Sequence, residues 1–246
     1  MKLFDKLGKA LKWLLIFFFG SSIFFVVLYK YVPVPCSPLM FIRCFQQISN
    51  HETLKLKHDW VPLEEMSPDL PLAVWSSEDQ NFLNHNGFDL DAIKDAIKEK
   101  QSGRRTRGAS TISQQTAKNV FLWPTASSGK MAWFRKGLEA YFTVLIEFFW
   151  DKQRIMEVYL NTIEMGDGIY GAESVAQEHF GVNAYNLNRS QCALIAVSLP
   201  NPRKFNSQYP SSYMYRRQNW CIRQMRWLGH FPTREEVKAQ KEAEAE

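Results

Sequence analysis

The chain has 246 residues and a mass of 28.7 kDa, which is enough for one domain of ordinary size and argues against two full catalytic domains. Hydrophobic residues make up 46% and charged residues 22%, a balance that excludes a wholly disordered or collagen-like protein. The net charge of +5 indicates anionic partners, which could be nucleic acid, phospholipid head groups or a phosphorylated substrate.

The first predicted element is a transmembrane helix at residues 13–32. Residues 13–29 carry no charge, and a helix of that length is about 26 Å long, close to the roughly 30 Å core of a bilayer. Lys30 lies within the span, but its long side chain can reach the membrane surface. The basic tail at residues 1–12 has a net charge of +3, so the positive-inside rule places it in the cytoplasm and the rest of the chain outside.

Two other interpretations of this segment are weaker. The apolar region of a cleaved signal peptide is usually about 7 to 15 residues long and ends in small residues, whereas this one ends in Tyr-Lys-Tyr-Val-Pro. A buried core helix would not need the unbroken Phe-rich run and its basic flank. A membrane anchor makes nucleic acid a less favoured partner, and we expect none.

The segment at residues 33–69 contains five prolines and predicts an irregular tether that leads into the domain. From residue 70 onward helical patterns dominate, and we expect one domain over residues 70–230. Asp89 can cap a helix whose apolar residues share one face. Residues 138–150 are apolar on nearly all sides, which is typical of a core helix or of a helix that touches lipid.

The last predicted elements are also helical. Residues 189–199 predict a buried helix that ends before Pro200. The next helix has an apolar stripe formed by Met214, Cys221, Met225 and Leu228. Thr233 and Glu236 form a capping box that opens a charged tail at residues 231–246, which we expect to fray. Because no run of alternating strands and no internal repeat is visible, the predicted class is mainly α.

The four cysteines are Cys36, Cys44, Cys192 and Cys221. They form no close Cys-X-X-Cys spacing and no pattern with histidine, so no zinc site is expected. Pairing of the first two and of the last two is one of three possible disulfide connectivities, and free buried thiols are an equally good interpretation.

Two short motifs match known functional motifs but lack the surrounding sequence features that those sites need. Residues 166–171 match Gly-X-Gly-X-X-Gly, but they follow a helix-like segment and no βαβ unit surrounds them. Residues 127–130 match the Ser-X-X-Lys of penicillin-binding transpeptidases, but the other motifs of that domain are absent. Neither nucleotide binding nor acyl transfer is favoured.

The charge distribution is more informative. Residues 101–136 contain no acidic residue and carry a charge of +7, and residues 201–230 form a second acid-free basic stretch. Either could be an ordinary solvated or lipid-facing surface. The first also contains a dense set of neutral hydrogen-bonding side chains, which suits sugars and phosphates. It therefore predicts a binding site for a polyanion.

Two candidate catalytic carboxylates, Glu78 and Glu139, flank that basic stretch. A sugar-transfer site needs one carboxylate to take a proton from the attacking hydroxyl group, and it can use a second one to position groups. Ordinary structural roles are open for both, since Glu139 could pair with Arg135 on a helix surface and Glu78 could complement a helix dipole.

Five blocks of sequence resemble the peptidoglycan glycosyltransferases of glycosyltransferase family 51, in particular the monofunctional biosynthetic peptidoglycan transglycosylases. The blocks are EDQNFLNHNGFD (78–89), RGASTISQQTAKN (107–119), RKGLE (135–139), KQRIMEVYLN (152–161) with GDGIYGAESVAQEHFG (166–181), and SQCALIAVSLPNP (190–202). They occur in the family's order over most of residues 70–205. The chain departs from the family at His179, where tyrosine is usual.

The resemblance implies a lysozyme-like, mostly helical fold and lipid II as substrate, which would be polymerised into glycan strands at the bacterial inner membrane with the domain in the periplasm. It implies that Glu78 is the catalytic base and Glu139 the second glutamate. The positions matching the donor and acceptor subsites are Asp79, Phe82, His85, Gly87, Ser110, Thr111, Gln114, Gln115, Lys118, Asn119, Arg135 and Lys136.

The chemistry of these residues agrees with that activity. A pyrophosphate leaving group needs cations to absorb its charge, and a divalent cation such as Mg²⁺ or Mn²⁺ could help. A lipid-linked substrate also requires a site at the bilayer surface, into which the aromatic residues of segments 120–123 and 131–134 could dip, although they could equally belong to the core. We expect membrane lipid, lipid II, the glycan strand and other cell-wall proteins as partners. A glycan-cleaving enzyme and a non-catalytic membrane scaffold are the rival interpretations.

Overall fold

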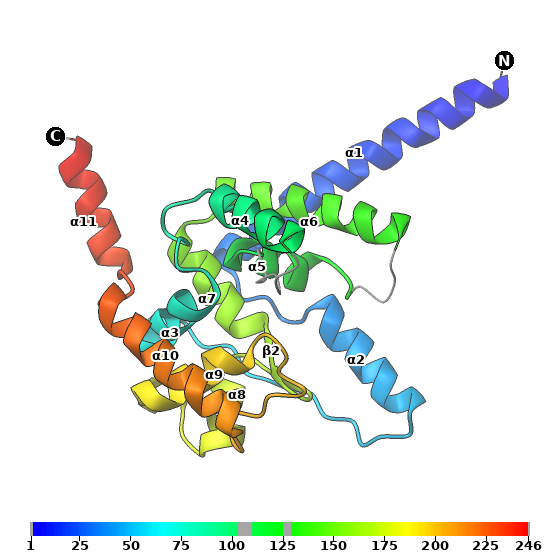
Figure 1. Cartoon of the computed structure of the whole chain (residues 1–246). Coiled ribbons are helices and arrows are strands. Elements are labelled where there is room, and N and C mark those ends of the chain that lie inside the picture. Colours follow the sequence, from blue (N-terminus) through cyan, green and yellow to red (C-terminus); the bar gives the residue numbers. More distant parts are fainter. Residues whose placement is uncertain (1, 103–109, 125–128, 246) are drawn as a thin grey trace.

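The computed structural model describes residues 2–102, 110–124 and 129–245, in which a mainly helical body carries two projecting terminal helices, α1 and α11 (Figure 1). The described elements, in chain order, are α1 (Lys2–Tyr31), α2 (Pro38–Ser49), β1 (Lys57–His58), η1 (Leu63–Glu65), α3 (Asp69–Glu78), α4 (Leu90–Gln101), α5 (Ile112–Phe121), α6 (Lys130–Phe149), α7 (Lys152–Thr162), β2 (Glu164–Gly166), β3 (Ile169–Tyr170), α8 (Ala172–Phe180), η2 (Ala184–Asn186), α9 (Arg189–Ser198), α10 (Ser212–Leu228) and α11 (Arg234–Ala245). The predicted mainly α class is confirmed.

The centre of the body is α7, in which every residue from Gln153 to Thr162 is buried. Helices α5 and α7 pack directly on each other, and α5 also packs along α6. On the other side, α3, α9 and α10 pack together, and α3 is buried from Leu70 to Ser76. The carboxyl end of α3 and the middle of α5 are thereby brought close to the same part of the interior.

A small sheet, which the sequence pattern did not reveal, lies beside these helices. Its strand order is β1-β3-β2, with β1 parallel and β2 antiparallel to β3. The glycines of the Gly-X-Gly-X-X-Gly motif lie in the β2–β3 hairpin and directly before α8, where Gly171 has a φ of +86°. Their role in the fold is therefore to form a tight hairpin and its exit.

Four predicted features of the helices are confirmed. The Asp89 carboxylate accepts a hydrogen bond from the Ala92 amide at 2.8 Å at the start of α4, and this bond is the main reason why its pKa is lowered. Helix α9 ends at Ser198, and the capping box of Thr233 and Glu236 opens α11. The stripe on α10 faces inward, since Met214, Cys221 and Met225 are buried.

The segment at residues 33–69 is more regular than we expected from its prolines. It contains α2, whose first residue is Pro38, a position at which the missing amide hydrogen is not needed by the helix. The Ser37 hydroxyl group caps this helix by accepting a hydrogen bond from the Met40 amide. All four cysteines are free thiols, with Cys192 and Cys221 buried.

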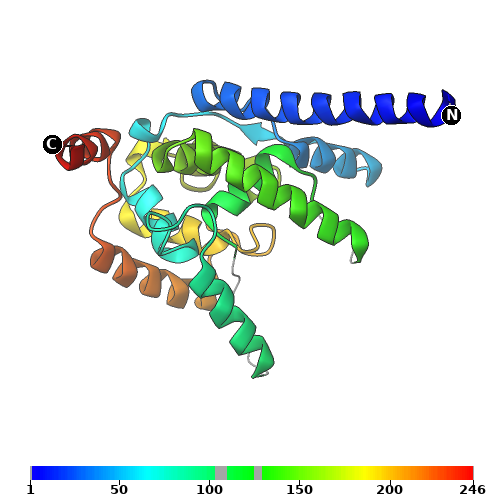
Figure 2. The same ribbon diagram turned by 90° about the horizontal axis from the view of Figure 1, so that it is seen from above.

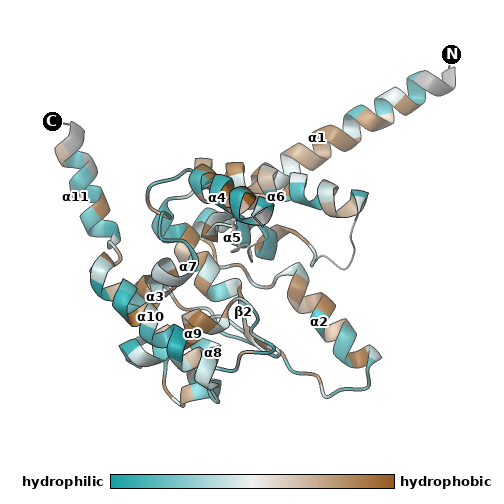
Figure 3. Ribbon diagram, viewed as in Figure 1, coloured by the Kyte–Doolittle hydropathy of each residue, from teal (hydrophilic) through white to brown (hydrophobic). Residues whose placement is uncertain are grey.

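Helix α1 is the one helix in the described part of the chain that is long and apolar enough to cross a membrane. Its candidate span runs from Asp5 to Tyr31 with a mean hydropathy of 2.2, and most of it is exposed. Figure 3 shows the apolar middle of α1 in brown and contrasts it with the polar α11. A helix this apolar and this exposed is compatible with a single-pass membrane anchor.

Helix α6 combines the two alternatives that its sequence left open. Glu139, Phe142, Thr143 and Ile146 are buried on one face, whereas Val144 and Phe148 are exposed on the other. The carboxyl-terminal half of α1 contacts α6, where Phe18, Phe19 and Ser22 of α1 meet Tyr141. Figure 2 shows α1 running along one side of the helical body.

The loop between α3 and α4 depends on Gly87. Its φ is +88°, which L residues rarely adopt, and a Cβ atom there would lie 2.7 Å from Thr143 Cγ2 and 3.0 Å from Glu147 Cγ on α6. The Gly87 carbonyl oxygen accepts a hydrogen bond of 2.7 Å from the Thr111 hydroxyl group. The glycine therefore lets this loop approach α6 and reach the start of α5.

We predict that Gly87→Ala lowers the free energy of unfolding by about 1 to 3 kcal/mol, because the alanine is strained and also collides with α6. The matched control is Gly137→Ala, since Gly137 lies within α6 and a Cβ atom at that position would meet no neighbouring group within 4 Å. That control should raise the free energy of unfolding by roughly 0.5 to 1 kcal/mol. Denaturant unfolding in detergent measures both, and equal stability of the two variants would contradict this explanation of the loop.

Candidate active site

The carboxylate of Glu78 lies at the carboxyl end of α3, facing α5. Its Oε2 atom accepts a hydrogen bond of 3.0 Å from Gln115 Nε2 on α5. The Gln115 Oε1 atom in turn accepts a hydrogen bond of 3.3 Å from the buried Tyr159 hydroxyl group on α7. Among the described residues, no hydrogen bond engages the other Glu78 oxygen, which is free to accept a proton.

The environment of Glu78 raises its pKa. Burial is the largest cause, because desolvation disfavours the charged carboxylate, and the neighbouring Asp79 adds to it. The hydrogen bond from Gln115 and the positive charges of Arg217 and Lys118 act in the opposite direction. A carboxylate with a raised pKa is a better proton acceptor than an ordinary surface glutamate.

Glu139 on α6 is buried and lies between two cations of its own helix. Arg135 Nη1 lies 3.5 Å from Glu139 Oε2, and Lys136 Nζ donates a short hydrogen bond to Glu139 Oε1. The ion pair with Arg135 that the sequence allowed for Glu139 is therefore present. It is mostly buried and does not lie on an exposed helix surface. A buried carboxylate of this kind holds the cations in place at a fixed distance.

Lys118 connects the two carboxylates. It projects from α5, and burial is the main reason why its pKa is lowered. The charges of Glu139 and Glu78 both act on it in the opposite direction, whereas Arg135 and Lys136 lower its pKa further. These groups form one electrostatic cluster. Its three cations, Lys118, Arg135 and Lys136, are called the α5–α6 cation cluster below, and its two acids are Glu78 and Glu139.

This cluster has donors that the described residues do not satisfy. The Nε and Nη1 atoms of Arg135 are buried and lack a hydrogen-bond partner among those residues. Leaving a buried donor without a partner costs about 1 to 3 kcal/mol. An acceptor, such as an anionic group, that bound beside Arg135 would satisfy these donors.

Four predicted site residues, Asp79, His85, Thr111 and Gln114, form a network that supports α5. Asp79 accepts hydrogen bonds from His85 Nε2 at 3.0 Å and from the Ile112 amide at 3.0 Å. The Thr111 hydroxyl group caps α5 by accepting from the Gln114 amide, while Gln114 Oε1 accepts from the Thr111 amide. These contacts fix the start of the helix that carries Gln115 and Lys118.

Phe82 lies in the core and not at an open surface. Its ring is fully buried, stacks on Phe231 at 6.4 Å, and lies 4.7 Å from Lys152 Nζ. The same ammonium group donates to the His85 carbonyl at 2.6 Å and to Glu147 Oε1 at 2.7 Å. Phe82 is therefore placed to support the site from behind.

The remaining sequence-predicted positions fall in different places. Ser110 is exposed directly before α5, and Asn119 is buried beside Lys118 in the sequence of α5. Three basic residues of the +7 stretch (Arg104, Arg105 and Arg107) and the first two residues of the Ser-X-X-Lys motif lie outside the described residues. The cation cluster therefore rests on Lys118, Arg135 and Lys136.

The sequence pattern did not point to Tyr159, which bonds to Gln115, or to Arg217, whose charge lowers the pKa of Glu78. Tyr159 belongs to the KQRIMEVYLN block, so the resemblance contained a signal for it. Arg217 belongs to the second basic stretch, and its guanidinium group stacks on Trp220 at 4.3 Å. The contact of that stretch with α3 depends on the packing of α10 on α3, which sequence spacing does not reveal.

The described residues contain no group of three His, Cys, Asp or Glu side chains that could hold a metal ion. Glu139 is already paired with two cations, and Glu78 is bonded to Gln115. The donor set of this site therefore fits an anion better than a protein-held metal, and a divalent cation at the pyrophosphate stays a prediction.

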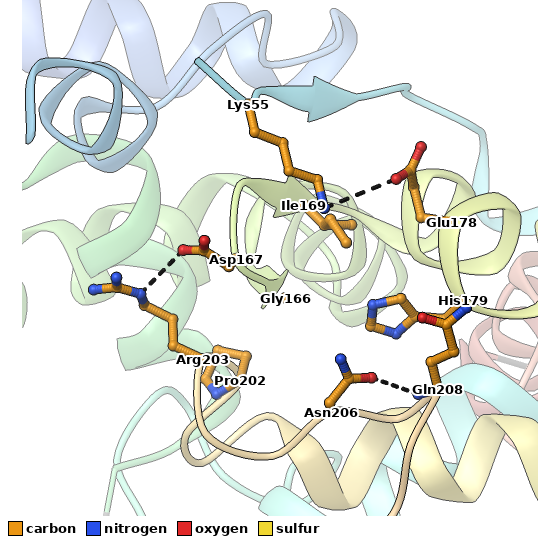
Figure 4. A pocket seen from close by; sticks show the side chains of 10 residues that line it. All are labelled: Lys55, Gly166, Asp167, Ile169, Glu178, His179, Pro202, Arg203, Asn206 and Gln208. Carbon is orange, nitrogen blue, oxygen red and sulfur yellow. Dashed lines mark hydrogen bonds and ion pairs between the residues drawn. The ribbon is translucent and has the colours of Figure 1, made fainter. Parts of the chain in front are cut away.

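His179, the departure from the family pattern, lines a separate polar pocket at the β2–β3 hairpin (Figure 4). Its Nδ1 atom lies 2.7 Å from the Ser207 hydroxyl oxygen, and its pKa is lowered mainly by burial. Two ion pairs cross the same pocket, Lys55 with Glu178 and Arg203 with Asp167. The histidine is accommodated by this local hydrogen bond.

Comparisons with known proteins place the site in context. Residues 46–226 match the family model described as Transglycosylase. Proteins named biosynthetic peptidoglycan transglycosylase are similar to the chain over most of its length. One from Bacteroides thetaiotaomicron is 54% identical over 89% of this chain and 86% of that protein. One from Bdellovibrio bacteriovorus is 53% identical, covering 84% and 82%, and one from Pseudomonas putida is 48% identical, covering 92% of each.

We predict that Glu139→Gln lowers the free energy of unfolding by roughly 3 kcal/mol, because it leaves a buried guanidinium group without its counter-charge. The matched control is Asp91→Asn, which removes an exposed pair with Lys94 on α4 and should change stability by less than about 1 kcal/mol. Denaturant unfolding of both variants measures the difference. If Glu139→Gln were as stable as the control, Glu139 would not be what holds the cations.

Proposed function

This chain belongs to the transglycosylase family, and we propose that it is a peptidoglycan glycosyltransferase, which polymerises lipid II into β-1,4-linked glycan strands for the bacterial cell wall. The names of its relatives support the biosynthetic direction of the reaction. The observation that carries the proposal is the combination of a proton-accepting Glu78 with the unsatisfied donors of Arg135 in one cation cluster.

Glu78 is the general base in this proposal. Its free oxygen takes the proton from the 4-hydroxyl group of the acceptor's GlcNAc, and the hydroxyl oxygen then attacks C1 of the MurNAc at the end of the growing strand. The bond from C1 to the pyrophosphate breaks, and undecaprenyl diphosphate leaves. Because an α-linked group is displaced from the opposite face, the product linkage is β and the reaction inverts.

The cation cluster stabilises the leaving group. Arg135 and Lys136 pair with Glu139, and the charge of Lys118 interacts with the same carboxylate. In this proposal the donors of Arg135 that lack a partner bind pyrophosphate oxygens. Cations fixed before the reaction stabilise developing negative charge without the cost of reorganising solvent. A strong general acid is therefore not required, which agrees with Glu139 being ion-paired.

The position of the anchor supports a lipid-linked substrate. We propose that α1 spans the inner membrane with its basic amino terminus in the cytoplasm and the domain on the periplasmic face. The Ser22 hydroxyl group of α1 lies 2.7 Å from the Tyr141 hydroxyl oxygen, only two residues after Glu139. The amino-terminal end of α6 also exposes Met131, Trp133 and Phe134, which suits contact with lipid.

The direct test incubates the detergent-solubilised protein with labelled lipid II and, separately, with purified sacculi. We expect glycan polymer from lipid II and no soluble fragments from sacculi. Fragments released from sacculi without polymer would favour a glycan-cleaving enzyme, and neither product would favour a scaffold.

The electrostatics of Glu78 predict how Arg217→Gln changes the pH dependence. The base must be deprotonated, so activity rises as the pH passes upward through the pKa of Glu78. Since the charge of Arg217 lowers that pKa, its removal raises the pKa and moves the acidic limb of the profile to higher pH. The matched control is Arg216→Gln, an exposed neighbour on α10, which should leave the limb in place. An unmoved limb in Arg217→Gln would contradict the assignment of Glu78 as the titrating base.

A further inference from the structure

The carboxyl end of α1 is bound by a side chain of the catalytic domain. Arg154 on α7 donates from Nε and Nη2 to the Tyr29 carbonyl at 3.0 and 2.7 Å, and from Nη2 to the Val32 carbonyl at 2.6 Å. The last carbonyls of a helix have no partner within it and carry the negative end of its dipole. A guanidinium group at this point satisfies them and complements their charge.

Two further contacts attach α1 at other levels. Trp150, directly after α6, donates from Nε1 to the Val26 carbonyl at 2.7 Å, and Ser22 meets Tyr141 of α6. Positions 22, 26 and 29 follow the spacing of one helix face. Helix α1 is therefore held in register along about two turns and not at one point.

Arg154 is itself fixed by its surroundings. It is only 8% exposed, forms a short ion pair with Glu157, and lies 5.1 Å from the ring of Trp60. Glu157 also accepts from Arg234 Nη2 at 2.5 Å. Burying charged groups costs several kcal/mol per ion before pairing repays it, and a flexible link between anchor and domain would not need such an arrangement.

The attachment bears on the proposed catalysis because α1 also contacts Tyr141 on α6 and Trp150 directly after it. Helix α6 carries Arg135, Lys136 and Glu139. We propose that Arg154 is a positioning residue, which joins α1 and the catalytic domain into one rigid body and so fixes the depth at which α6 presents its cations to substrate in the bilayer. The catalytic part of this inference rests on the proposed function, whereas the rigid attachment does not.

The experiment measures distances in the full chain reconstituted in lipid nanodiscs. Nitroxide labels replace Leu11 on α1 and Met131 on α6, both exposed, in a background in which Cys36 and Cys44 are serine. With Arg154 present, pulsed electron resonance should give one narrow distance distribution. Arg154→Met should broaden or shift it, and Arg154→Lys, which can still donate to a carbonyl, should restore it in part. The matched control, Arg189→Met, removes a half-exposed arginine paired with Asp69 and should leave it narrow.

Activity separates positioning from a general loss of structure. In Arg154→Met, polymerisation of lipid II in bilayers should fall on the order of tenfold or more. It should fall much less in detergent micelles, where no bilayer sets the depth. A structural defect would lower both rates alike, and that result would overturn the positioning role.

Trp150→Phe keeps an aromatic ring but removes the donor to Val26, so it decides the question if Arg154→Met does not fold. Narrow distributions in every folded variant, or a broad distribution with undiminished activity in bilayers, would overturn the proposal. If the unsubstituted chain gave a narrow distribution but no polymer, the proposed function would fail while the rigid attachment would stand.

Discussion

The buried ion pairs around Glu139 are the interaction on which the site depends. Two cations of α6 are held against one carboxylate, and Lys118 approaches the same carboxylate from α5. Three positive groups around one negative group leave a surplus of positive charge in a partly desolvated place, and such a surplus is stabilised by an anion. The unsatisfied donors of Arg135 lead to the same conclusion from hydrogen bonding. The substrate's pyrophosphate would supply the missing charge and the missing acceptors together.

The rest of the domain holds the two acids on different helices, with Glu78 at the end of α3 and Glu139 on α6. The carboxylate of Asp79 ties the loop after α3 to the start of α5, the helix that carries both Gln115 and Lys118. Gln115 donates a hydrogen bond to Glu78, and the charge of Glu139 acts on Lys118. The two adjacent acidic residues differ, because both oxygens of Asp79 accept hydrogen bonds, whereas among the described residues only one oxygen of Glu78 does. Helix α6 also contacts α1, so if α1 spans the bilayer as proposed, the position of the candidate site is mechanically connected to that of the bilayer.

The sequence predicted the features that depend on local pattern and missed those that depend on long-range packing. Caps at Asp89 and Thr233 could be predicted, since a cap and its partner lie within three residues. The sequence does not predict α2, because proline usually breaks a helix, whereas Pro38 stands at the first helical position, where proline is tolerated. The charge pattern reveals the basic stretch but not that the Nε and Nη1 atoms of Arg135 are buried, or that Arg217, more than a hundred residues from Glu78, acts on it. The contacts of Arg154 with the end of α1 were equally invisible, since they join residues 122 and 125 positions apart.

The measurement that tests the central claim most directly is a single-turnover assay of labelled lipid II with Glu78→Gln, which keeps the shape of the side chain and the contact with α5 but removes the basic oxygen. If Glu78 is the base, the rate should fall by roughly 10²- to 10⁴-fold, while the binding of lipid II and the stability of the protein stay close to those of the unsubstituted chain. Polymerisation by the folded glutamine variant at an undiminished rate would contradict the account.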